Sequence, residues 1–138
     1  MRQRFYSFVP IRLMVFCLIL IGSSFGLFAR QLPMLVREVI SVDLMMEKTN
    51  PPNAIIKAKG KVMTAGHSNP RLLQVLYVTP PADGVQEFEF YVDPPPPSKV
   101  VAQVITDIET PLLRIEHIPT WMKGIRVRAQ TNTLDKLF

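Results

Sequence analysis

The sequence predicts an all-β domain that follows a short N-terminal targeting segment. Thirteen prolines divide the 138 residues into short apolar stretches, which argues against a helical bundle. Apolar and polar residues alternate within several of these stretches, as they do along a strand with one buried face. A hydrophobic content of 48% is enough for the core of one ordinary domain.

Alternation is clearest in residues 54–63, 85–92 and 125–130. In the second segment Phe88 and Phe90 would face the core while acidic residues face solvent. In the third segment the outward positions carry arginine. The outward positions of the first segment form a basic stripe of Lys57, Lys59 and Lys61.

Four more segments complete a set of seven expected strands: residues 36–46, 72–79, 100–108 and 112–118. The second and third of these are nearly continuous apolar runs, as in strands covered on both sides. Residues 36–46 also fit a helical stripe, but their β-branched side chains favour a strand. Seven short strands in about 100 residues are typical of an antiparallel, immunoglobulin-like β-sandwich.

The segments between the expected strands contain residue types that are typical of turns and loops. Residues 80–84, with the sequence PPADG, predict a tight reversal in which proline fixes φ and glycine accepts a positive φ. Residues 64–70 predict a longer polar loop. Four consecutive prolines, residues 94–97, predict a stiff, polyproline-like crossing.

The N-terminus has the order of a secretory signal. An uncharged apolar run, residues 13–29, follows three arginines. Ser24 and Gly26 supply the small residues that signal peptidase requires, so we expect a signal peptide over residues 1–26 and cleavage before Leu27.

The alternative is an uncleaved anchor over residues 1–29. Seventeen apolar residues of a helix span about 25 Å, which suffices for a thin bilayer. In both cases the arginines remain inside, so the domain is exported to the periplasm or the extracellular space, or is held outside by a single-pass anchor. We expect a linker over residues 27–35 and the β-sandwich domain over residues 36–138.

Cys17 is the only cysteine and lies in the apolar run. The exported domain therefore has no disulfide and depends on its core for stability.

The net charge of +5 would suggest nucleic-acid binding, but three of the positive charges lie in the signal segment. Without residues 1–26, 13 basic residues remain against 11 acidic ones. The basic stripe has no aromatic residues interleaved with it, so we interpret it as a solvated face or a protected edge strand. We expect no binding of nucleic acid.

No combination of residues predicts catalysis. His67 and His117 are the only histidines and have no clustered metal ligands, and no serine has a neighbouring base. Glu87 and Glu89 share an exposed face, where their pKa values would not be driven apart. We expect no catalytic or metal site, no cofactor and no small-molecule ligand.

The candidate contact residues lie in two loops. One loop contains Met122 and Trp121, the only tryptophan. The tryptophan side chain either contacts a partner or closes one end of the core. The polar loop and the residue after it add His67, Asn69 and Arg71. We expect a non-catalytic module that binds another envelope or extracellular protein or has a structural role. The alternatives are peptide binding at an edge strand and, less favoured, a small hydrolase.

Overall fold

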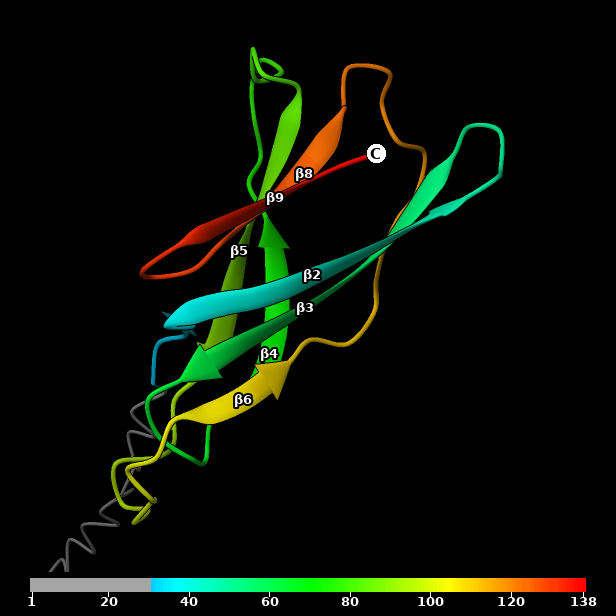
Figure 1. Cartoon of the computed structure of the whole chain (residues 1–138). Helices are drawn as coiled ribbons and strands as arrows, with labels where there is room; N and C mark the ends of the chain where they lie inside the picture. Colours follow the sequence, from blue (N-terminus) through cyan, green and yellow to red (C-terminus); the bar gives the residue numbers. More distant parts are fainter. Residues whose placement is uncertain (1–30) are drawn as a thin grey trace, which may run out of the picture.

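The computed structural model describes residues 31–138, so the N-terminal segment and Cys17 lie outside the described residues. Within this part of the chain nine strands form two sheets, and there is no helix (Figure 1). The strands are β1 (Met34–Leu35), β2 (Glu38–Glu47), β3 (Asn53–Val62), β4 (Ser68–Gln74), β5 (Val85–Asp93), β6 (Thr106–Glu109), β7 (Leu113–Ile115), β8 (Gly124–Arg128) and β9 (Thr133–Leu137). Residues 31–138 accordingly include no helix of the length and apolarity that a membrane span requires.

Each sheet is built around one long strand. In the five-stranded sheet β5 pairs with β4 on one edge, while β1 and β8 share the other edge and β9 follows β8. In the four-stranded sheet β3 pairs with β2 on one edge, and β6 and β7 share the other. Every pairing is antiparallel except β5 with β8, which is parallel. The result is an all-β fold in which two mainly antiparallel sheets pack as in a β-sandwich.

The core lies between the central strands of the two sheets. Phe88 and Phe90 are buried, as the alternation predicted, and they meet the inward residues of β3 and β8. A Cβ atom added to Gly60 would lie 2.9 Å from the Phe90 ring, which is too close for a real contact. Glycine at this position therefore allows the ring to approach the backbone of β3.

Two connections between strands are secured by polar side chains. The Asn132 amide donates to the Val39 carbonyl (2.9 Å) and accepts from the Val39 N–H (2.8 Å). This pairing fixes the turn between β8 and β9 against the start of β2, where the β2–β3 register shifts between Val39 and Ser41. Between β6 and β7, the Thr110 hydroxyl accepts from the Ala58 N–H (3.0 Å) where no strand partner is available.

The segments with clear alternation are confirmed as strands. The strand expected over residues 36–46 is confirmed as β2, which begins two residues later and ends at Glu47. The tight reversal is confirmed too, since the Gly84 N–H donates to the Pro81 carbonyl (3.0 Å) and Gly84 has a φ of 69°. The structure adds β1 and β9, which the sequence pattern did not predict.

The prediction of a strand over residues 72–79 is wrong in its bounds. Strand β4 begins at Ser68, inside the expected polar loop, and ends at Gln74. Gln74 already pairs with Phe88, near the start of β5, and the prolines at 80 and 81 then turn the chain. Continued beyond Gln74, this register would place residues 78 and 79 opposite residues before Val85, where β5 begins, and residues 76–79 stay exposed.

The prediction of a covered strand over residues 100–108 is wrong for the same reason. Only Thr106–Glu109 forms a strand, because its partner β3 ends at Val62, opposite Thr106. Val100 is 98% exposed and Ile105 is 62% exposed. The apolar run is therefore a surface loop.

We predict that Phe90→Ala lowers the free energy of unfolding by about 3 to 5 kcal/mol, because it leaves a cavity over Gly60. The control Glu89→Ala removes an ion-pair partner at the surface and should cost less than about 1 kcal/mol. Urea unfolding of both variants measures the difference. Equal midpoints would contradict the packing described here.

Candidate functional site

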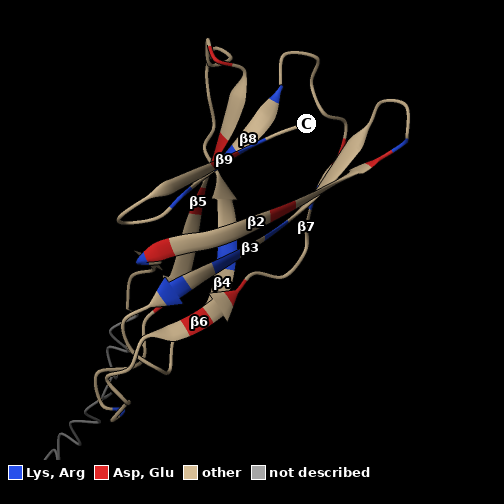
Figure 2. Cartoon of the chain, viewed as in Figure 1, with Lys and Arg blue, Asp and Glu red and all other residues tan. Residues whose placement is uncertain are grey.

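The basic stripe lies on the outer face of the four-stranded sheet. Strand β3 is central in this sheet, so the interpretation of the stripe as a protected edge is wrong. Lys57 lies opposite Asp43 and Lys61 lies opposite Glu38 on β2. The Lys57 ammonium also lies 2.5 Å from Glu109 of β6. Figure 2 shows the basic positions of β3 between acidic positions of β2 and β6.

This face is a mixed-charge surface. Hydrogen bonding to Lys57, with the charges of Lys57 and Lys59, lowers the pKa of the Glu109 carboxyl. Carboxylates on both sides thus neutralise the lysines locally. A phosphate backbone would have to displace them or bind beside them, which does not favour a nucleic-acid surface.

The outer face of the five-stranded sheet is also organised by ion pairs. Arg126 contacts both carboxylate oxygens of Asp135 at 2.8 Å and also reaches Asp83 at 3.2 Å. Arg128 lies 3.5 Å from Glu87 and 3.7 Å from Glu89. Glu87 and Glu89, the two carboxylates that share this face, therefore both lie beside Arg128.

No group of three or more potential metal ligands occurs in residues 31–138. The ring Nδ1 of His67 lies 2.9 Å from the Thr64 carbonyl within its own turn. His117 adopts a positive φ of 54°, and its N–H donates to the Asn53 side chain (3.0 Å). The two histidines thus occupy separate turns.

The five candidate contact residues lie at opposite ends of the domain. His67 lines a hollow with Pro94 and Pro95, beside the point where the described chain begins. Asn69 and Arg71 both donate to Asp93 (3.0 and 2.9 Å) in the same region. Trp121 and Met122 belong to the loop before β8, at the other end of the sandwich (Figure 1).

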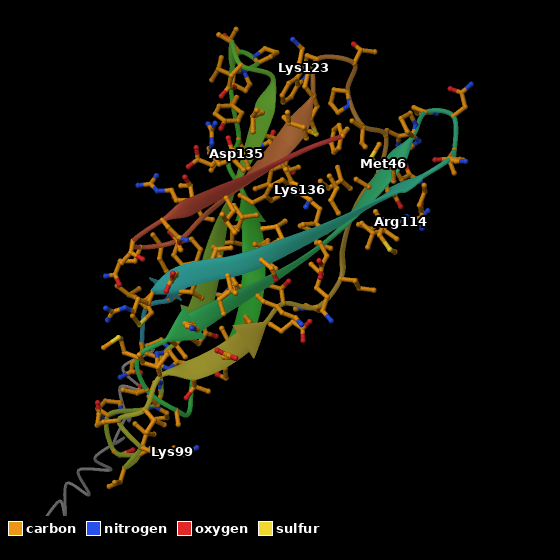
Figure 3. The ribbon with its side chains drawn as sticks, in the orientation of Figure 1. Met46, Lys99, Arg114, Lys123, Asp135 and Lys136 are labelled. Atoms are coloured by element: carbon orange, nitrogen blue, oxygen red, sulfur yellow. The ribbon has the colours of Figure 1, made fainter. Side chains whose placement is uncertain are left out.

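The end with the tryptophan is formed by two loops that we call the tip, residues 75–84 and 116–123. Their paths lie together at one end of the ribbon in Figure 1, and Figure 3 shows Lys123 at that end. Met122 is buried in a small cluster with Ala54 and Ile118, while Trp121 packs against that cluster and remains partly exposed. Trp121 therefore closes the core on one side and faces solvent on the other.

A shallow groove of about 300 Å³ lies beside Trp121. Its apolar wall consists of Leu76, Tyr77, Val78 and Pro80, and Gln86 lies in it too. Leu76 is 87% exposed and Val78 is fully exposed. These apolar residues were predicted to be strand, so the sequence pattern missed them as candidate contact residues.

Hydrogen bonds fix the two loops of the tip. The buried Gln86 amide donates to the carbonyls of Val75 (2.7 Å) and Glu87 (3.0 Å). The Lys123 N–H donates to the Gly84 carbonyl (2.7 Å) and joins the second loop to the first. A Cβ atom at Gly84 would lie 2.8 Å from the Trp121 carbonyl, so only glycine permits this approach. The exposed apolar residues are thus presented on a defined backbone.

Comparison of the chain with protein-family models, with curated proteins and with solved structures finds no match.

We predict that the stability of the domain falls in acid. The Val85 N–H and then Arg126 lower the pKa of Asp83, and the Asn53 amide and then Arg114 lower that of Glu47. A carboxyl with a lowered pKa stabilises the fold above its unfolded pKa of about 4, and this contribution is lost as the pH falls through the folded value. Urea midpoints should be level from neutral pH to about pH 5 and fall below about pH 4.

Asp83→Asn provides the matched control, because its side-chain oxygen can still accept from Val85 but carries no charge. The acid-side slope should be shallower in this variant. An unchanged slope would show that Asp83 does not take part in the acid sensitivity.

Proposed function

We propose that this chain is an exported, non-catalytic β-sandwich module that binds another envelope or extracellular protein through the tip. The observation that carries the proposal is the row of exposed apolar residues 76–78, held beside Trp121 by the buried Gln86. Binding sites are commonly placed on loops that a rigid scaffold positions.

The chemistry of the tip suits a protein partner. Residues 75–82 carry no charge, and the centres of protein interfaces are depleted of charge and enriched in tryptophan and tyrosine. The fixed backbone reduces the entropy that binding would otherwise cost. The groove is shallow and open, which fits an apolar side chain of a partner better than an enclosed substrate.

The proposal also includes the type of β-sandwich and the location of the protein. The immunoglobulin-like type is supported by a five-stranded and a four-stranded sheet within about 100 residues. Export is supported by the arginine-led apolar run of the sequence, residues 13–29.

A second candidate function is peptide binding by addition of a strand to β2. This strand is an edge of its sheet and contains no lysine. Its register is regular from Val42 to Glu47, after the shift near Val39. Met45 and Met46 are exposed along this part, and methionine adapts well to varied partners.

Photo-crosslinking in cells distinguishes these surfaces. We predict that a photoreactive residue at position 76 or 78 of the full chain forms an adduct with one defined protein, because the tip is the contact surface. Position 45 tests the β2 edge, and position 59, in the mixed-charge face, is the control. The adducts are identified by mass spectrometry.

An adduct from position 45 alone would favour strand addition. The same set of adducts from all positions, including 59, would refute a specific contact at the tip, as would the absence of any adduct from positions 76 and 78.

A further inference from the structure

The hollow beside His67, at the end of the sandwich opposite the tip, brings together three side chains that can bind a metal. It has a volume of about 310 Å³ and is lined by Met34 and Met63 as well as by His67. Thioether sulfur and imidazole nitrogen are neutral ligands, and soft sulfur ligands favour soft ions such as Cu(I). The hollow therefore has the donor atoms of a soft-metal site.

The crossing of the chain from one sheet to the other places these residues together. Met34 lies in β1, in the five-stranded sheet. The chain then enters β2 beside the end of β3, where the Arg37 N–H donates to the Lys61 carbonyl (3.0 Å) (Figure 1). Met63 directly follows β3, and His67 lies at the end of the turn after it. The two sheets thus position all three donors.

One ring nitrogen of His67 has its lone pair available for a metal. The other, Nδ1, lies 2.9 Å from the Thr64 carbonyl oxygen, which can only accept a hydrogen bond. Nδ1 therefore carries the proton, and the lone pair of the neutral ring is on Nε2. Metal-binding histidines are commonly oriented in this way, by donation of the second ring N–H to a carbonyl or a carboxylate.

The two methionine side chains are accessible from solvent. Met34 is 40% exposed and Met63 is 48% exposed, although methionine is among the residues most often buried. The guanidinium of Arg37, which also lines the hollow, donates to the Met63 sulfur. A sulfur that accepts from an exposed cationic group has a lone pair at the surface rather than in the core. A metal cation can therefore reach it by displacing the Arg37 side chain.

The composition of the hollow favours a soft monovalent ion over a divalent one. Among the described residues that line it there is neither a carboxylate nor a cysteine. Structural Zn²⁺ sites use cysteine and histidine, and Ca²⁺ and Mg²⁺ require oxygen ligands. The positive charge of Arg37 opposes a divalent cation more strongly than a monovalent one.

We propose that Met34, Met63 and His67 bind one Cu(I) ion in this hollow, through the two thioether sulfurs and Nε2 of the imidazole. The Arg37 guanidinium leaves the Met63 sulfur when the ion binds. The ion keeps its oxidation state, so the proposal includes no redox step. It goes beyond the proposed function and does not depend on a partner at the tip or on export.

The test is a titration with Ag⁺, which has the charge and the filled d shell of Cu(I) but is stable in air. The full chain is used in detergent with Cys17→Ser, because this thiol would bind the same ion. With ¹³C-labelled methionine methyl groups, we predict that the resonances of Met34 and Met63 shift together and reach their end points at about one equivalent of Ag⁺. Met45 and Met46, which are exposed on β2, should not shift over this range.

Single variants test each ligand. Met34→Leu and Met63→Leu remove a sulfur at almost constant volume, so the fold should be retained. Each should weaken the binding of Ag⁺ at least about tenfold, as should His67→Gln, whereas the matched control Met45→Leu should leave it unchanged. Cu(I), kept reduced with ascorbate in the absence of oxygen, should shift the same two methyl resonances as Ag⁺.

Shifts of Met45 and Met46 at the same Ag⁺ concentration as those of Met34 and Met63 would overturn the proposal. Unchanged affinity in Met34→Leu would overturn it too, as would Zn²⁺ binding as tight as that of Ag⁺. These measurements use purified protein without a partner. Their failure is therefore distinguishable from failure of the tip, which is scored by the adducts from positions 76 and 78.

Discussion

The approach of the Phe90 ring to the backbone of Gly60 sets the distance between the two sheets. Each residue lies in the central strand of its sheet, so the strands on either side are positioned by this contact through their registers. A side chain at position 60 would meet the Glu38 carbonyl as well as the ring. The contact therefore constrains β2 together with β3 and β5, and no disulfide within residues 31–138 could replace it, because they contain no cysteine. The loops at both ends of the sandwich therefore join strands whose separation this contact sets.

The strands with one buried face could be predicted because burial imposes a period of two on the sequence. Residues 54–63 and 85–92 showed this period, and their inward residues are the buried ones. The runs over 72–79 and 100–108 were misjudged because β-branched composition indicates that a segment can pair, not that an edge is available to it. The partner of the first run, β5, begins only at Val85, and the partner of the second run, β3, ends at Val62. Both bounds are set by residues far from the runs in the sequence.

The candidate surfaces could be predicted only in part for a related reason. Trp121 was identified from its residue type and loop position, but its neighbours 76–78 come from a segment about 40 residues earlier. The polar residues that fix the structure, such as Gln86 and Asn132, give no local signal, since their partners are distant backbone groups. The apolar runs over residues 72–79 and 100–108, which were expected to be covered strands, instead expose apolar side chains at the surface.

The parallel pairing of β5 with β8 has a consequence for the order of folding. The edge of β5 that β8 occupies stays vacant until residues 124–128 have been synthesised, and the turn that secures the start of β2 comes later still. The five-stranded sheet therefore cannot be completed before residues 124–137 are synthesised, whereas all strands of the four-stranded sheet lie before them. Contacts this distant in sequence form slowly, which delays completion of the fold. For the export proposed above such a delay is an advantage, because a chain has to enter a secretory translocation channel unfolded.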